Sequence, residues 1–134
     1  MAPELHRPFA GETVLIVDDD EIVRGLLRAL LRVAGLDVVA ETASGERALA
    51  AFRTHRPQIV CLDIDMPDMN GLEVLSRIRA MSAETIVLMV TAETTEENMR
   101  QAIADKANGI IAKPFNTARV MEAIRRALQR ASAG

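Results

Sequence analysis

The sequence predicts an α/β domain built on a five-stranded parallel sheet. Five short runs rich in Val and Ile recur along the chain, and three of them are apolar almost throughout, which is typical of strands covered on both faces. Amphipathic stretches with helical spacing separate these runs. The predicted strands end near residues 18, 41, 63, 91 and 113, so that each interval holds one strand and one helix. This alternation predicts βαβ units with right-handed crossovers.

The strands are predicted where the apolar runs lie, at Thr13–Val17, Asp37–Ala40, Ile59–Leu62, Thr85–Val90 and Gly109–Ala112. Together with their helices they occupy residues 13–130 as one domain. We expect residues 1–12 to be a flexible N-terminal tail and residues 131–134 a C-terminal tail.

The helices are predicted from apolar spacing and from capping residues. The first begins after Asp20, which we expect to cap it, and ends at Gly35, a residue typical of helix C-termini. Its predicted apolar face consists of Ile22, Leu26, Leu30 and Val33. The other four are marked by Ser44 as a cap before Pro57, by Asn70 as a cap with Glu73 three residues later, by Thr94 and Glu97 as a capping box, and by Val120, Ile124 and Leu128 at helical spacing.

Composition limits the class of protein. The chain has 134 residues, 49% hydrophobic and 26% charged, which is typical of one ordinary globular domain. No apolar run approaches the roughly 20 residues that span a bilayer. The net charge of −3 argues against nucleic acid and against an anionic membrane as partners. The one cysteine, Cys61, allows no internal disulfide and favours a cytoplasmic location; we expect it to be a small buried hydrophobic residue.

Polar residues interrupt the apolar pattern where the predicted strands end. Asp18 and Asp19 follow the first strand, Asp63 follows the third, Thr91 ends the fourth and Lys113 ends the fifth. The carboxyl ends of parallel strands share one edge of an open sheet, where ligands bind. We therefore expect these five residues to converge.

This cluster predicts a divalent cation site for phosphoryl chemistry. Three carboxylates beside one ammonium carry a charge of −2, which a divalent cation neutralises, and oxygen ligands on loops suit Mg²⁺ best. Asp63 is the best placed of the acids to act as a nucleophile and form an aspartyl phosphate. Thr91 and Lys113 are expected to contact phosphoryl oxygens.

The motifs at these strand ends resemble those of response-regulator receiver domains of two-component signalling. The matching pieces are Val17-Asp18-Asp19, Asp63-Ile64-Asp65-Met66-Pro67 with Gly71, Val90-Thr91-Ala92 and Lys113-Pro114-Phe115. The resemblance covers about residues 13–130. It implies a flavodoxin-like sheet of strand order 2-1-3-4-5, with five helices on both faces.

The resemblance also implies a role for each residue of the cluster. Asp63 is the expected phospho-acceptor, Asp18, Asp19, Asp63 and the main-chain carbonyl of Asp65 the expected Mg²⁺ ligands, and Thr91 and Lys113 the expected phosphoryl contacts. A cis peptide is expected at Lys113-Pro114. The expected donor is a histidine kinase or a phosphotransfer protein, and the expected readers are downstream proteins that contact the fourth and fifth βα units. The chain would then be a switch that supports only its own phosphorylation and dephosphorylation, and not an enzyme.

One position departs from the family. Three residues before Lys113, where the family often has an aromatic residue, stands Ile110, and the chain has no Tyr or Trp. We therefore expect an aliphatic repacking, or a shift of the loop after Thr91, in place of a ring-based switch.

Three other functions compete with this interpretation. Asp63-Ile64-Asp65 also resembles the nucleophile motif of haloacid-dehalogenase-like phosphatases, but that family needs an acidic pair after the lysine, and no Asp follows Asp105. A degenerate receiver that only binds proteins would not need the complete set of acids, Thr and Lys. A receiver excised from a longer regulator with an output domain has the same motifs as a single-domain receiver.

Overall fold

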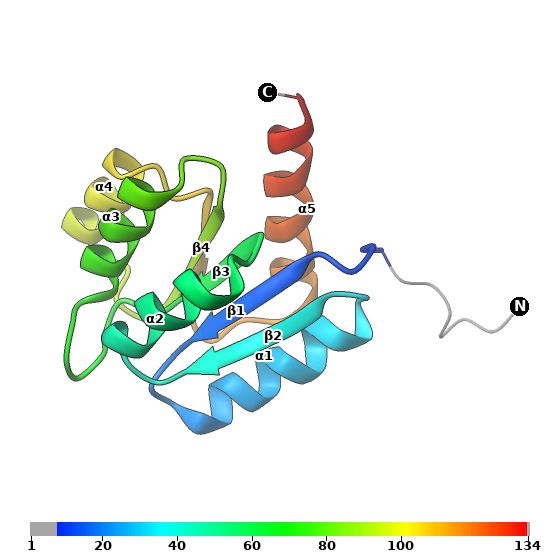
Figure 1. Cartoon of the computed structure of the whole chain (residues 1–134), viewed down its shortest axis with the longest axis horizontal. Coiled ribbons are helices and arrows are strands. Elements are labelled where there is room, and N and C mark those ends of the chain that lie inside the picture. The colour runs from blue at the N-terminus through cyan, green and yellow to red at the C-terminus, as the bar shows by residue number, and fades with distance from the viewer. Residues whose placement is uncertain (1–7, 134) are drawn as a thin grey trace, which may run out of the picture.

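The computed structural model describes residues 8–133, in which five parallel strands form one sheet in the order β2-β1-β3-β4-β5 (Figure 1). The strands are β1 (Thr13–Val17), β2 (Asp37–Thr42), β3 (Ile59–Leu62), β4 (Ile86–Thr91) and β5 (Gly109–Ala112). Because β1 lies between β2 and β3, the chain reverses direction across the sheet at the β1–β3 pair, where ligand sites form in folds of this kind. The predicted fold class and strand order are confirmed.

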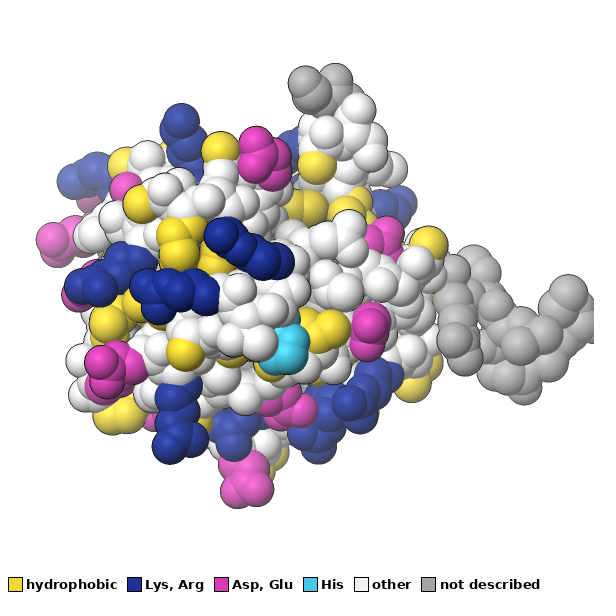
Figure 2. Space-filling model, in the orientation of Figure 1, with side chains coloured by type: hydrophobic (Ala, Val, Ile, Leu, Met, Phe, Trp, Pro, Cys, Tyr) yellow, Lys and Arg dark blue, Asp and Glu magenta, His cyan; other side chains and the backbone are white. Residues whose placement is uncertain are grey.

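Five helices cover the two faces of the sheet. They are α1 (Glu21–Val33), α2 (Gly45–His55), α3 (Gly71–Met81), α4 (Glu96–Ala104) and α5 (Thr117–Ala133). One core cluster, which we call the α1–α5 core, joins the helices α1 and α5 to one face of the sheet. A second, the α2–α4 core, joins α2, α3 and α4 to the other face. On the side that α2 and α3 cover, charged side chains of both signs are spread between apolar atoms, as expected for helices with a solvated outer surface (Figure 2).

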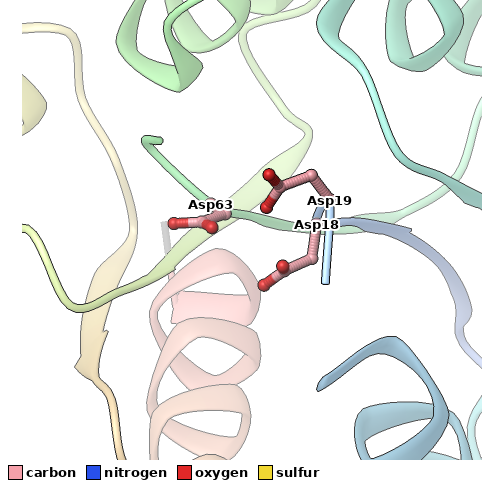
Figure 3. Close-up of side chains that lie close together, drawn as sticks. All are labelled: Asp18, Asp19 and Asp63. Carbon is pink, nitrogen blue, oxygen red and sulfur yellow. The ribbon is translucent and has the colours of Figure 1, made fainter. Parts of the chain in front are cut away.

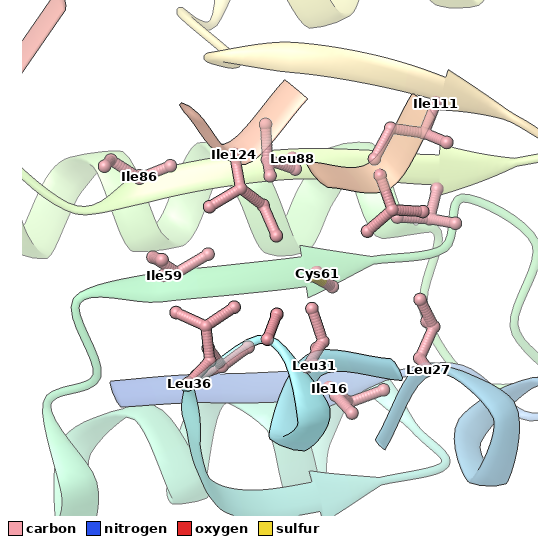
Figure 4. Close-up of a cluster of buried hydrophobic side chains, with 14 of the residues drawn as sticks. Ile16, Leu27, Leu31, Leu36, Ile59, Cys61, Ile86, Leu88, Ile111 and Ile124 are labelled. Atoms are coloured by element: carbon pink, nitrogen blue, oxygen red, sulfur yellow. The ribbon is translucent and has the colours of Figure 1, made fainter. Parts of the chain in front are cut away.

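Along each central strand, successive side chains belong alternately to the two clusters. Ile16 and Cys61 belong to the cluster beneath α1 and α5 (Figure 4). Leu15 and Leu62, one position along each strand, belong to the cluster beneath α2, α3 and α4. Burial raises the pKa of the Cys61 thiol to about 12, so this cysteine packs as a small hydrophobic residue, as predicted. Strands buried on both faces explain why the runs are apolar throughout.

Three of the four residues of the predicted apolar face of α1 are exposed, and only Leu30, which is partly buried, packs against the core as predicted. Leu27 and Leu31 are the fully buried residues of this helix, whereas Ile22, Leu26 and Val33 are 81%, 55% and 77% exposed. The helix carries two neighbouring apolar stripes, and helical spacing alone does not tell which of them faces the sheet. A smaller correction applies to α4, which is capped by Thr95 and not by Thr94: the Thr95 side chain accepts from the Asn98 amide.

The ends of the domain differ from the predicted boundaries. Phe9 is buried in the α1–α5 core, and its amide donates to the carbonyl of Ala34 at 3.2 Å, so part of the predicted N-terminal tail belongs to the core. Residues 1–7 of that tail lie outside the described part of the chain. At the other end α5 continues to Ala133, past the predicted limit at residue 130, because Ala131, Ser132 and Ala133 can all continue a helix. Within residues 8–133, no helix is both long enough and apolar enough to cross a bilayer.

Candidate functional site

Three carboxylates converge at the carboxyl ends of β1 and β3. Asp18 and Asp19 follow β1 directly, Asp63 follows β3, and the Asp63 amide donates to the Val17 carbonyl at 2.9 Å. One oxygen from each carboxylate lies within 4.8 Å of the other two (Figure 3). Asp18 and Asp63 are buried and Asp19 is exposed, so the cluster lies partly inside the protein and is open to solvent on the side of Asp19.

Lys113 completes the cluster from the end of β5. Its Nζ lies 2.7 Å from Asp18 Oδ2 and 3.1 Å from Asp63 Oδ2, and the peptide bond to Pro114 is cis, as predicted. Burial alone would lower the pKa of Lys113, but the adjacent Asp18 and Asp63 carboxylates outweigh it and raise that pKa above its ordinary value. Lys113 therefore stays protonated, and three carboxylates beside one ammonium give the cluster a formal charge of −2.

The two oxygens of Asp18 have different surroundings. Oδ1 accepts a hydrogen bond from the Asp20 amide at 2.9 Å, which holds the turn between β1 and α1. Oδ2 is buried and accepts no hydrogen bond of good geometry from residues 8–133; its contact is the ion pair with Lys113. Burial raises the pKa of Asp18, and the contacts with Lys113 and the Asp20 amide only partly oppose this. A buried carboxylate oxygen with free lone pairs is the kind of ligand that a hard divalent cation binds.

Neighbouring residues hold the β1–α1 turn in place. Asp20 caps α1 as predicted, accepting from the Ile22 amide at 2.9 Å. The Arg24 guanidinium donates to the Asp18 carbonyl at 2.6 Å, a contact that the sequence did not suggest. Because Arg24 lies six residues further along, this bond ties the first turn of α1 to the acidic residue itself.

Thr91 lies at the same edge of the sheet. It is buried at the end of β4, the strand next to β3, and its carbonyl accepts from the Lys113 amide at 2.9 Å. Its hydroxyl accepts from the Glu93 amide at 3.0 Å, which shapes the loop after β4. Asp65 is exposed, and its amide donates to Asp63 Oδ1 at 3.4 Å. The strand ends thus bring Asp18, Asp19, Asp63 and Lys113 into one cluster, with Thr91 and Asp65 on its border.

Gly71 has a role that the sequence showed only as part of a motif. A Cβ atom at this position would lie 1.9 Å from the Asp63 carbonyl oxygen, and the Gly71 amide donates to the Ile64 carbonyl at 2.7 Å. The start of α3 therefore packs directly against the backbone of Asp63, and only glycine permits this approach.

Asp68 is a second residue that sequence reasoning missed. Its carboxylate accepts from the amides of Gly45 and Glu46 at the start of α2. The contact joins residues more than 20 positions apart, and no local pattern in the sequence indicates it.

Comparisons with known proteins agree with this geometry. The family model of the response regulator receiver domain matches residues 14–125. The chemotaxis protein CheY of Bacillus subtilis is 36% identical over 115 residues, which are 86% of this chain and 96% of that protein. The CheY of Halobacterium salinarum is 36% identical over 114 residues, covering 85% and 94% of the two chains.

Solved structures show the same likeness. The CheY-like receiver domain protein of Methanospirillum hungatei superimposes with a TM-score of 0.87 at 27% identity, over 92% of this chain and 98% of that one. A CheX-CheY-BeF3-Mg complex from Borrelia burgdorferi superimposes with a TM-score of 0.86 at 29% identity, over 89% and 90% of the chains. The chain therefore belongs to the response regulator receiver domain family, and it is a CheY-like receiver of phosphorylation-dependent signalling.

Proposed function

We propose that Asp63 is the phospho-acceptor of this receiver and that the reaction depends on Mg²⁺. The observation that carries the proposal is the convergence of Asp18, Asp19 and Asp63 around the ammonium of Lys113. The convergence also disfavours the phosphatase alternative, because the acidic pair beside the acceptor comes from β1, upstream of Asp63, and not from a segment after the lysine.

The residues present suit a magnesium ion. The buried Oδ2 of Asp18, the exposed carboxylate of Asp19, one oxygen of Asp63 and the main-chain carbonyl of Asp65 are the proposed ligands, which leaves room for water on the open side. The bound ion would supply neutralisation of the negative charge on the phosphoryl oxygens.

The proposed reaction moves a phosphoryl group from a phosphohistidine to Asp63. A carboxylate oxygen of Asp63 forms a bond to phosphorus while the nitrogen–phosphorus bond of the donor breaks, and the bonding electrons return to the imidazole nitrogen. Lys113 is already within 3.1 Å of Asp63 Oδ2 and can move to pair with a phosphoryl oxygen. Thr91 can donate a hydrogen bond from its hydroxyl to another phosphoryl oxygen. In its contact with the Glu93 amide the hydroxyl is the acceptor, so its own hydrogen is not used there.

We propose that the signal travels from Thr91 to the fourth and fifth βα units by aliphatic repacking. Ile110 is partly buried and packs against the α2–α4 core, as Met99 and Ala107 also do, and it stands where the family often has an aromatic ring. A movement of Thr91 toward the phosphoryl group would shift the loop that leads into α4 and thereby change this packing. Downstream proteins would read the changed surface.

The surface beside the cluster supports a protein as the phosphoryl donor. The exposed stripe of Ile22 and Leu26 on α1 lines a mainly apolar hollow of about 350 Å³. Lys113, Pro114 and Phe115 line the same hollow. Lys113 lines the hollow and also contacts Asp63. A donor protein bound to this stripe would therefore lie next to the acceptor carboxylate. We propose a histidine kinase or phosphotransfer protein in this role, acting in the cytoplasm.

Intact-mass measurement after incubation with acetyl phosphate and Mg²⁺ tests the proposal. We expect one added phosphoryl group on the wild-type chain, none on Asp63→Asn, and none when the cation is chelated. Asp37→Asn is the matched control, because it makes the same chemical change at an exposed position at the start of β2. Equal labelling of the wild type and Asp63→Asn would overturn the assignment.

A further inference from the structure

The loop between Asp63 and α3, residues 64–70, is held at its base and at its tip. At the base, the Gly71 amide donates to the Ile64 carbonyl, and the Asp65 amide lies 3.4 Å from Asp63 Oδ1. The Met66 side chain is buried in the α2–α4 core. The base therefore fixes where the loop leaves the sheet.

At the tip, the Asp68 carboxylate accepts two hydrogen bonds from the first turn of α2. Oδ1 accepts from the Gly45 amide at 2.9 Å, and Oδ2 accepts from the Glu46 amide at 3.0 Å. Ser44, the residue that caps the helix, takes only the third amide, that of Arg47. Two of the amides that a helix leaves free at its start are thus satisfied by the acceptor loop.

Close backbone packing accompanies these hydrogen bonds. A Cβ atom on Gly45 would lie 2.7 Å from Met69 Cβ, so the loop lies directly on the helix start. The helix in turn packs on β1, because Ala48 and Leu49 share the buried cluster that contains Leu15 and Val17. The helix α2 therefore links the loop that follows Asp63 to β1, the strand that leads into Asp18 and Asp19.

We propose that Asp68 is a positioning residue for the phospho-acceptor site. By clamping the loop tip to α2, it holds the Asp65 carbonyl at a set distance from the carboxylates of β1, and its loss weakens divalent cation binding. This inference rests on the proposed function, since it takes the Asp65 carbonyl to be a ligand. A simple helix cap would contribute to stability but would leave the affinity for the cation unchanged.

The test is a calorimetric Mg²⁺ titration of the full chain, with Mg²⁺ alone as the probe. We expect Asp68→Ala to raise the Kd about tenfold, the range found when groups that orient metal ligands are removed. Asp68→Asn has the same charge as the Ala variant but keeps one acceptor oxygen, so we expect an intermediate Kd. That difference separates the clamp from the loss of a negative charge, and the Asn variant also carries the test if the Ala variant does not fold.

Ser44→Ala is the matched control for helix capping. It removes a hydrogen bond from the same turn of α2 without touching the acceptor loop, so we expect its Kd to stay within about twofold of the wild type. At saturating Mg²⁺ we expect Asp68→Ala to recover the wild-type extent of labelling by acetyl phosphate, because the chemical groups at Asp63 are intact.

The outcomes separate the two proposals. A wild-type chain that binds Mg²⁺ and is phosphorylated, while both Asp68 variants keep its Kd within twofold, overturns the clamp alone. A wild-type chain that neither binds the cation nor takes up a phosphoryl group overturns the proposed function and the clamp with it. Slower amide exchange at Gly45 and Glu46 on adding Mg²⁺ to the wild type, but not to Asp68→Ala, would support the clamp independently.

Discussion

Replacing Gly71 by alanine is expected to disturb the backbone of Asp63, the proposed phospho-acceptor. The new Cβ would lie 1.9 Å from the Asp63 carbonyl oxygen, and real Cβ contacts essentially never fall below 3.0 Å. The backbone of Asp63 or the start of α3 must therefore move by more than 1 Å. Both partners are buried backbone, so no flexible side chain can relieve the overlap. We expect a loss of about 3 kcal/mol in the free energy of unfolding, at the upper end of the range for overpacked sites.

Gly25→Ala provides the matched control. Gly25 lies in the middle of α1, and the nearest atom to its added Cβ would be an Arg28 nitrogen at an ordinary 3.5 Å. Since alanine favours the helix more than glycine, we expect this variant to gain about 1 kcal/mol in stability. Urea denaturation measures both changes, and intact-mass measurement after exposure to acetyl phosphate reports on Asp63. A Gly71→Ala protein that matches the wild type in stability and in labelling would refute the argument from close approach.

Three further predictions follow from burial and charge. Leu27→Ala should lower the free energy of unfolding by about 3 kcal/mol, whereas Leu26→Ala, which is 55% exposed, should change it by less than about 0.5 kcal/mol; equal losses in urea denaturation would contradict the assignment of the α1 face. Burial raises the pKa of Asp18, so folding disfavours its ionised form. Without metal, Asp18→Asn should therefore be more stable than the wild type at pH 7, and this advantage should shrink as the pH falls through that raised pKa. Thermal denaturation at several pH values measures it, and an advantage that grows toward low pH would have the wrong sign. In Lys113→Arg, a planar fork replaces the ammonium that touches both Asp18 and Asp63. We expect acceptor labelling by mass to persist while the phosphorylation-dependent change in amide exchange of α4 is lost, and a preserved exchange change would count against this.

The bounds of the strands could be predicted closely from the local pattern of apolar residues. The predicted bounds of β1, β3 and β5 agree with the structure, β2 is two residues longer than predicted, and β4 begins and ends one residue later. For β1 and β3 this agreement has a physical cause: a strand buried on both faces must be apolar along its length, and such a run is visible without knowledge of its neighbours.

Helix faces are less accessible to sequence reasoning. On α1, both the stripe of Ile22 and Leu26 and the stripe of Leu27 and Leu31 satisfy helical spacing, and only the second packs on the sheet. The choice depends on how the helix is rotated above the strands, which the packing of α1 against β1 and β2 decides.

The order of elements and the chemical nature of the groups at each strand end are properties of the sequence by itself. They were sufficient to predict a parallel sheet with polar groups at one edge, and the resemblance to receiver domains supplied the strand order that gathers Asp18, Asp19, Asp63 and Lys113 there. The tertiary structure alone decided the contacts around those groups: the ion pair of Lys113 with the buried Oδ2 of Asp18, the approach of Gly71 to Asp63, and the hydrogen bonds of Asp68 to the start of α2. Such contacts join residues that no period relates, and their energies depend on distances of a few tenths of an ångström, which only the packed chain sets.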